Sequence, residues 1–332
     1  MTEGPQVNLE TELAKLQQAR EGIARVVVGQ REAIDQVLMS LISGGHVLLE
    51  AAPGMGKTLL VRTLAQVFGM RFSRVQFTPD LMPADITGTV VLIHDDQGKT
   101  HLEFQPGPIF AQLVLADEIN RATPKTQSSL LEAMQEHTVT VAGSQHQLPE
   151  PFFVLATQNP IEQEGTYLLP EAQIDRFFFK VQIPYPPEKV LEEILELTTG
   201  AEEVKAEQVL TPEDIVHLQR LTRAVPVASH VRQAVAKFVL ATQPSDPKNL
   251  KEVQRYVRFG VSPRGGQALV LAAKAHALLA GRYNVAFDDL RAVLFPALRH
   301  RFNLNFEGQA EGVSVDGLLA KLFSETVGKQ AV

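Results

Sequence analysis

The chain has 332 residues, and at roughly 150 residues per domain this length suggests about two domains. The formal net charge is −7 with both signs interspersed, which argues against a general nucleic-acid binder but does not exclude a local basic groove. There is no cysteine, so disulfides, cysteine-ligated zinc and thiol catalysis are excluded.

The first segment, Met1 to Glu10, is polar, and no uninterrupted apolar stretch of about 18 residues follows. We therefore expect no signal peptide, no membrane span and a cytoplasmic location.

Residues 9–42 have apolar side chains at helical spacing, beginning with Leu9, Leu13 and Leu16. This pattern predicts two helices, with a break between them at Val28-Gly29-Gln30.

Four short apolar runs then suit buried parallel strands, at 46–50, 113–116, 152–156 and 177–181. Helical segments such as 126–135 lie between them, so the alternation predicts an α/β fold whose parallel sheet has helices on both faces. Two segments interrupt this order and predict β-hairpins: 87–104, around a turn at 95–98, and 138–148.

Three prolines, Pro184, Pro186 and Pro187, mark a boundary. Helical patterns dominate beyond them, so we expect an α/β core over residues 1–186 and a smaller all-α lid domain over 187–332.

The segment from Ala51 to Thr58 follows the first buried strand and opens a helix, as a phosphate-binding loop must. The backbone N–H groups of such a loop and the helix N-terminus converge on one anion site. Gly54 and Gly56 let the backbone approach the phosphates, Lys57 reaches the β- and γ-phosphates, and the Thr58 hydroxyl binds Mg²⁺. The alternative is an ordinary strand-turn-helix with an exposed lysine.

Ala51 departs from the usual motif, which has glycine at this position. If the position needs a positive φ, alanine costs on the order of 1 kcal/mol; at ordinary strand-end dihedrals the cost is small.

Asp117 and Glu118 end another buried strand, at the same sheet edge as the phosphate loop. We expect Asp117 to hold Mg²⁺, through water, and Glu118 to activate the attacking water. The alternative for this pair is a helix cap beside a surface acid.

Gln158-Asn159 follows the next strand at this edge, where an amide can position water or contact the γ-phosphate. The alternative is a capping asparagine before Pro160.

Arg176 precedes the strand that starts at Phe177, so it lies at the opposite, N-terminal edge of the sheet. It cannot reach its own nucleotide, but as an arginine finger it can reach a neighbour's, an interaction worth about 10³ to 10⁵ in rate. The alternative is an ion pair with Asp175 or Glu171.

Arg264 follows Ser262 and Pro263, which suit a helix start. A cation in the first helical turn opposes the helix dipole, which suggests an anionic ligand such as phosphate. The alternative is a solvated surface arginine.

His300 and Arg301 follow one another near a predicted helix end. We expect them to form a favourable pair of cations at the helix C-terminus, without a chemical role.

Together these residues resemble the MoxR family of AAA+ ATPases over nearly the whole chain. The stretches that carry the resemblance are Val28–Gln30, the phosphate loop, Asp117–Ala122, Leu130–Met134, Ala156–Pro160, Glu162, Glu164–Tyr167, Leu169–Phe177, Gly260–Arg264, Gly281–Tyr283 and Arg299–Arg301. The resemblance implies the Walker A, Walker B, sensor 1, arginine-finger and sensor 2 roles for Lys57–Thr58, Asp117–Glu118, Asn159, Arg176 and Arg264, respectively. It identifies the hairpin at 87–104 with the helix-2 insert and that at 138–148 with the pre-sensor-1 hairpin.

The full set of site residues that we predict has three parts. The cofactor contacts are Val28, Gly29, Pro53, Gly54, Met55, Gly56, Lys57, Thr58, Leu59 and Arg264; the metal ligands are Thr58 and Asp117; the catalytic residues are Lys57, Glu118, Asn159 and Arg176. The cofactors are ATP and Mg²⁺.

The resemblance further implies a homo-hexameric ring with a chaperone-like role in complex assembly or metal-cofactor insertion, often with partners that carry a von Willebrand factor A domain. The family usually has glycine at the position of Ala51, which puts the hydrolysis rate in question but not nucleotide binding.

Three other functions stay open. A nucleic-acid motor is disfavoured because the hairpin at 138–148 has His146 but no lysine or arginine. A magnesium-chelatase-like subunit would need a metal–tetrapyrrole substrate. A nucleotide-controlled switch would bind ATP with negligible turnover.

Overall fold

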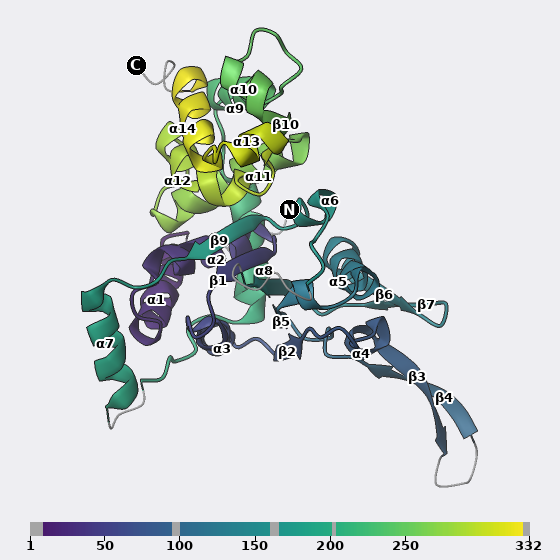
Figure 1. Cartoon of the computed structure of the whole chain (residues 1–332). Helices are drawn as coiled ribbons and strands as arrows, with labels where there is room; N and C mark the ends of the chain where they lie inside the picture. Colours follow the sequence, from purple (N-terminus) through teal and green to yellow (C-terminus); the bar gives the residue numbers. More distant parts are fainter. Residues whose placement is uncertain (1–8, 95–99, 160–165, 201–203, 328–332) are drawn as a thin grey trace, which may run out of the picture.

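The computed structural model describes residues 9–94, 100–159, 166–200 and 204–327. At its centre is a five-stranded sheet in the order β2-β5-β8-β1-β9, in which every neighbouring pair is parallel. The strands are β1 (Val47–Ala51), β2 (Phe72–Gln76), β5 (Leu113–Asp117), β8 (Phe153–Gln158) and β9 (Phe179–Ile183). Helices lie on both faces of this sheet (Figure 1), so the predicted α/β fold class is confirmed.

The two faces of the sheet bury separate hydrophobic cores, because successive strand residues point to opposite sides. Leu49, Leu115 and Leu155 enter one core, and Leu48 and Val154 enter the other. The helices before β9 that contribute to these cores are α1 (Leu9–Val26), α2 (Arg31–Ser43), α3 (Lys57–Val67), α4 (Pro83–Thr87), the 3₁₀ turn η1 (Ile119–Arg121) and α5 (Pro124–Glu136). The short α6 (Glu171–Ile174) directly precedes β9.

The edge strand β2 was not predicted from the sequence. Of its five residues only Val75 is buried, so it lacks the continuous apolar run of a central parallel strand. Its pairing with β5 brings Arg74 and Gln76 to the edge of the sheet where Asp117 lies.

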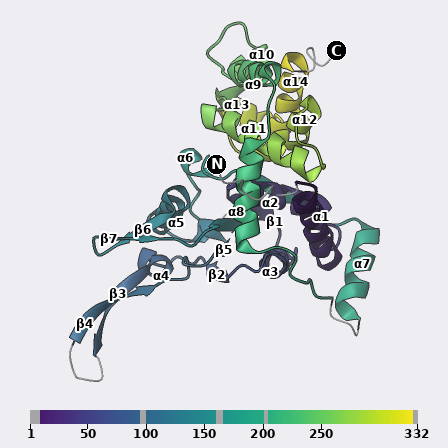
Figure 2. The same cartoon turned by 180° about the vertical axis from the view of Figure 1, so that it is seen from behind.

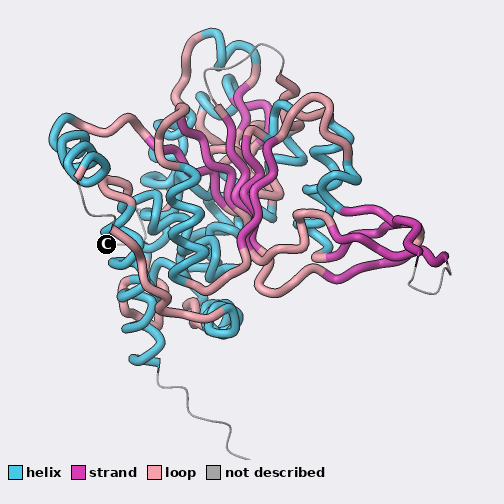
Figure 3. Tube along the Cα trace, turned by 90° about the horizontal axis from the view of Figure 1, so that it is seen from below, coloured by secondary structure: helices cyan, strands magenta, loops and turns pink. Residues whose placement is uncertain are grey.

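Both predicted hairpins are confirmed and project from the same side of the molecule (Figure 3). They consist of β3 (Gly88–His94) with β4 (Thr100–Pro106), and β6 (Thr138–Val141) with β7 (Ser144–Gln147). The ring of His146 in the second hairpin stacks on Phe104 of the first, with 3.8 Å between ring centres, so this histidine joins the two hairpins. The turn expected at 95–98 lies outside the described residues.

The chain after β9 is mainly helical, as predicted, and its elements are α7 (Glu188–Thr199), α8 (Pro212–Ala224), α9 (Ser229–Ala241), α10 (Lys251–Tyr256), α11 (Pro263–Leu279), α12 (Phe287–Leu298), α13 (Phe306–Ala310) and α14 (Val315–Thr326), with β10 (Val257–Phe259) paired to β11 (Asn303–Leu304). Helices α9 to α14 gather at one end of the molecule, while α7 lies apart at the periphery (Figure 2).

The domain boundary between residues 186 and 187 stays a proposal. Beyond it α8 packs back on α2, where Gln219 Nε2 donates to the Leu41 carbonyl at 2.9 Å. No helix in the described ranges has the length and apolarity needed to cross a membrane.

Arg301 connects the helical lid to the sheet. Its side chain is buried and donates to Asp175 Oδ1 at 2.7 Å and to the carbonyls of Phe177 and Phe178 at 2.7 and 3.0 Å. His300 is buried as well, with Nε2 at 3.0 Å from the Phe177 carbonyl, and burial lowers its pKa well below the usual value. The predicted pair of cations at a helix end is therefore wrong, because His300 is neutral and Arg301 is an interdomain anchor.

We predict that Arg301→Met lowers the free energy of unfolding by about 3 kcal/mol, because it leaves Asp175 and buried carbonyls without their donor. Denaturant unfolding measures this change. Arg291→Met is the matched control, since Arg291 is exposed on the same lid and has no ion pair among the described residues. Equal unfolding midpoints for the two variants would contradict the anchoring role.

His46, just before β1, is a second buried neutral histidine. Its Nε2 lies 3.0 Å from the Met134 carbonyl, and its Nδ1 accepts from the Val154 N–H at 3.1 Å. These contacts require the tautomer with hydrogen on Nε2, because Nδ1 must stay unprotonated to accept. Burial, with a smaller contribution from nearby His137, lowers the pKa of His46 to about 4.

Stability should therefore fall as the pH drops from about 6.5 towards 4, since the unfolded chain binds a proton that the folded chain excludes. We predict that His46 accounts for about 2 to 3 kcal/mol of the stability lost between pH 7 and pH 4.5. Unfolding of the wild type and of His46→Gln at both pH values measures it. The variant should lose less stability than the wild type, and an equal loss in both proteins would exclude this role.

Candidate nucleotide-binding and catalytic site

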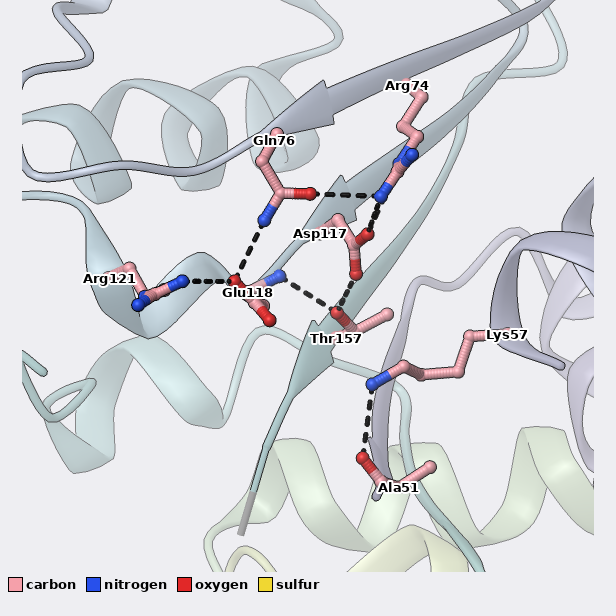
Figure 4. Close-up of polar contacts among 8 residues, drawn as sticks. All are labelled: Ala51, Lys57, Arg74, Gln76, Asp117, Glu118, Arg121 and Thr157. Atoms are coloured by element: carbon pink, nitrogen blue, oxygen red, sulfur yellow. Dashed lines mark hydrogen bonds and ion pairs between the residues drawn. The ribbon is translucent and has the colours of Figure 1, made fainter. Parts of the chain in front are cut away.

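The phosphate loop adopts the geometry that its sequence predicts. It connects β1 to α3, with positive φ at Gly54 (78°) and Gly56 (71°). A Cβ atom added at Gly54 would meet nothing within 4 Å, so the loop opens onto free space. Lys57 Nζ donates to the Ala51 carbonyl at 3.1 Å (Figure 4).

Ala51 is the last residue of β1 and is not among the described residues with positive φ. Alanine therefore fits this position without backbone strain, and the cost on the order of 1 kcal/mol that a positive φ would bring does not apply.

The residues predicted to contact the nucleotide from outside the phosphate loop lie beside this loop in the structure. Gln30 Nε2 donates to the Met55 carbonyl at 2.9 Å, which fixes the break at Val28–Gln30 beside the loop. Thr58 and Leu59 occupy the first turn of α3, and Pro53 is exposed on the loop.

Asp117 is held at the end of β5 by two neighbouring strands. Its Oδ2 accepts from Arg74 Nη2 at 2.6 Å and from Arg74 Nε at 3.2 Å, and its Oδ1 accepts from Thr157 Oγ1 at 2.7 Å (Figure 4). The carboxylate lies at the same edge of the sheet as Lys57 (Figure 4), and its role as a metal ligand stays a prediction.

Glu118 has a left-handed backbone, with φ of 57° and ψ of 50°, which is unusual for a residue other than glycine. Thr157 Oγ1 supports this turn by accepting from the Glu118 N–H at 2.9 Å. The carboxylate Oε2 accepts from Gln76 Nε2 at 2.9 Å and from Arg121 Nη1 at 3.0 Å (Figure 4). Gln76 of β2 and Arg121 of η1 therefore hold the Glu118 carboxylate between them.

Asn159 follows β8 at this same edge and is buried. Pro160, to which its alternative capping role refers, lies outside the described residues, as do Glu162, Glu164 and Gly165.

Arg176 and Arg264 lie elsewhere, beside the start of β1, where both line one cavity with Gly45. The phosphate loop begins after the other end of this five-residue strand, about 16 Å away at the usual rise per residue. Sequence reasoning placed Arg176 at this edge but did not place Arg264 there.

The structure bears on the alternative roles of Arg176 and Arg264, an ion pair for the first and a solvated side chain for the second. Arg176 makes no ion pair within the described part of the chain, because Asp175 pairs with Arg301 at 2.7 Å and Glu171 with Arg258 at 3.8 Å. Arg264 lies 3.9 Å from Asp175 Oδ2 and its side chain is 51% exposed, so it is only weakly held.

Sequence reasoning missed four residues that contact the acidic pair: Arg74, Gln76, Arg121 and Thr157. Arg74 and Gln76 come from the strand that was not recognised. For Thr157 a signal was available, since it stands one residue before the Gln158-Asn159 pair.

The comparisons with known proteins agree with this geometry. The model of the "ATPase family associated with various cellular activities (AAA)" matches residues 46–179, and an AAA lid domain model matches 250–322. The fold is that of an AAA+ ATPase with its lid domain.

Similar individual proteins show to which family of AAA+ ATPases the chain belongs. The chain is 44% identical to the uncharacterised protein YeaC of Bacillus subtilis over 93% of both proteins. It is 42% identical to chaperone MoxR1 of Mycobacterium tuberculosis, over 92% of this chain and 80% of that protein. A crystal structure of a candidate ATPase from Cytophaga hutchinsonii superposes with a TM-score of 0.88 at 35% identity, covering 96% of this chain and 95% of that one. The chain belongs to the MoxR family of AAA+ ATPases.

We predict that Arg74→Gln strengthens Mg²⁺-dependent nucleotide binding by about threefold to tenfold, because it frees the Asp117 carboxylate of a competing cation. Titration with a fluorescent ATP analogue at several Mg²⁺ concentrations measures this. Arg71→Gln is the control, as Arg71 is exposed just before the same strand. An unchanged or weaker dependence on Mg²⁺ would show that Arg74 does not compete for Asp117.

Proposed function

We propose that this chain hydrolyses Mg-ATP at the interfaces of a homo-hexameric ring and uses the energy to remodel a protein client. The observation that carries the proposal is the separation of charges across the sheet. The phosphate loop and acidic pair lie at one edge, and Arg176 and Arg264 lie at the other. A chain whose nucleotide-facing edge lacks these arginines needs a neighbour to supply them.

Within one protomer, different residues bind the phosphates and the Mg²⁺ ion. Backbone N–H groups at Gly54 and Gly56 and the amine of Lys57 bind the phosphates. Thr58 and Asp117 are oxygen donors of the kind that suits Mg²⁺, which typically keeps few protein ligands alongside phosphate oxygens. When bound, this ion would neutralise charge on the transferred phosphoryl group.

Catalysis then depends on the position of Glu118. Its carboxylate takes the proton of the attacking water, and Asn159 orients that water, as the oxygen–phosphorus bond to the leaving ADP breaks. In the structure Glu118 is engaged by Gln76 and Arg121. We infer that it must leave these partners before it can act, and that Arg176 of the neighbour stabilises the charge that develops on the phosphate.

A nucleotide-controlled switch is the second candidate, and the restraint of Glu118 is the observation in its favour. Under this alternative Glu118 never leaves Gln76 and Arg121, so ATP binds without turnover. A cytoplasmic location, a partner with a von Willebrand factor A domain and a role in metal-cofactor maturation are proposals that rest on the family alone.

We predict that two inactive variants, Glu118→Gln and Arg176→Ala, regain activity when they are mixed. Random assembly makes some sites from an intact Glu118 and a neighbour's intact Arg176, so an equal mixture should reach about a quarter of the wild-type rate per protomer. Steady-state ATPase assays measure this, and each variant alone is the control. A mixture as inactive as its components would contradict a site shared between protomers.

The client surface that we propose is the hairpin β3–β4, where Leu92 and Leu102 are paired across the strands and are 61% and 70% exposed. An exposed apolar pair on a projecting hairpin is typical of an interaction site.

We predict that Glu118→Gln protein loaded with ATP retains client proteins from a cell extract, and that adding Leu92→Ser and Leu102→Ser removes them. Quantitative mass spectrometry of the retained proteins measures both effects. The control pair is Thr89→Ser with Gln105→Asn, which are paired on the same hairpin. Equal recovery with the leucines replaced would exclude the hairpin as the client surface.

A further inference from the structure

Helix α7 (Glu188–Thr199) has two distinct faces and no buried residue. Glu188, Glu192 and Glu196 follow one another at four-residue spacing and form an acidic row. Val190 and Ile194 lie on the other side of the helix. None of its glutamates forms an ion pair with another described residue.

Such a helix is poorly stabilised by its own chain. Twelve residues are marginal for an isolated helix, and like charges at four-residue spacing oppose its formation. The exposed acidic row of a helix at the periphery of the molecule fits a partner surface that carries basic side chains.

A surface of this kind exists on the same protein, in the cavity of about 1130 Å³ that Arg176 and Arg264 line. Its apolar part includes Val239 and Leu240, and Leu240 is 65% exposed. Its basic part includes Arg223, Arg232 and Lys274.

This basic group has no acidic neighbour in the described part of the chain to balance it. Lys274 Nζ donates to the Arg223 carbonyl at 2.6 Å. Burial lowers the pKa of Lys274, and the positive charges of Arg223 and Arg232 lower it further. Among the described residues that line the cavity, Asp175 is the only carboxylate, and Arg301 already engages it. A chain of net charge −7 thus concentrates unbalanced positive charge in one cavity.

The helix and the cavity lie on opposite sides of one protomer. Val190 of α7 packs so closely on Gly29 that a Cβ at this glycine would lie 2.1 Å from Val190 Cγ1, so α7 borders the nucleotide side. The cavity is on the Arg176 side. When Arg176 of one protomer faces the phosphate loop of the next, as in the function proposed above, the helix and the cavity lie in the same interface.

We propose that α7 of each protomer docks in the basic cavity of its neighbour, with Glu192 and Glu196 facing Arg232 and Lys274. The partner is a second copy of this chain. The inference rests on the shared site of the proposed function, and it adds a second contact that links the lid of one protomer to the nucleotide side of the next.

Cross-linking tests this docking directly, because the natural chain has no cysteine. Protein carrying Glu192→Cys is mixed with protein carrying Arg232→Cys in the presence of ATP and oxidised glutathione. A disulfide-linked dimer should form in the mixture and in neither protein alone. The matched control replaces Glu192→Cys with Glu207→Cys, an exposed glutamate outside α7, and should give no dimer.

Charge exchange provides an independent measurement. Glu192→Arg with Glu196→Arg should raise the concentration for half-assembly by about tenfold, as judged by sedimentation, and adding Arg232→Glu with Lys274→Glu to the same chain should restore it.

The possible results separate the two proposals. Absence of the cross-link in a protein that still assembles and hydrolyses ATP would overturn the docking of α7 and leave the shared site intact. Failure to assemble at all, together with no activity in the mixture of Glu118→Gln and Arg176→Ala, would overturn both.

Discussion

The parallel direction of all five strands governs where chemistry can occur in this protein. Strands β1, β5 and β8 end at one edge, so that edge holds the residues at or just after their ends: Lys57, Asp117, Glu118 and Asn159. Whatever precedes a strand is placed at the other edge, as Arg176 is before β9. A single sheet thus has the phosphate loop and the acidic pair at one edge, and Arg176 and Arg264 at the other. Because the two groups lie at opposite edges of one sheet, the proposed head-to-tail association is what would bring Arg176 of one copy to the phosphate loop of the next.

The acidic edge is held by interactions between strands. Thr157 of β8 hydrogen-bonds both Asp117 Oδ1 and the Glu118 N–H, and it therefore fixes the left-handed turn of Glu118. From the other side, β2 supplies Arg74 to Asp117 and Gln76 to Glu118. These contacts give both carboxylates positively polarised partners, which lowers the repulsion between two neighbouring acids. Under the proposed function, Asp117 and Glu118 would exchange these partners for Mg²⁺ and the attacking water.

Much of the fold was predictable from the sequence, because four strands are continuous apolar runs and the lid helices have regular spacing. The strand β2 was not, since Phe72, Ser73 and Arg74 at the sheet edge are not buried. The phosphate loop and the acidic pair were predictable because each follows a recognised strand. The partners Arg74, Gln76 and Thr157 were not identified, since their roles depend on which strands are neighbours. The charge state of His300 was also mispredicted, because burial decides it and helix position does not.

The most direct test of this account is the ATPase rate per protomer over a wide range of protein concentration. A site completed by Arg176 of a neighbour predicts a rate that rises with concentration and then reaches a plateau, with the half-maximal concentration matching that for assembly in sedimentation experiments. A constant rate per protomer at concentrations where sedimentation finds monomers would contradict the account, because a single chain would then contain every group that catalysis needs.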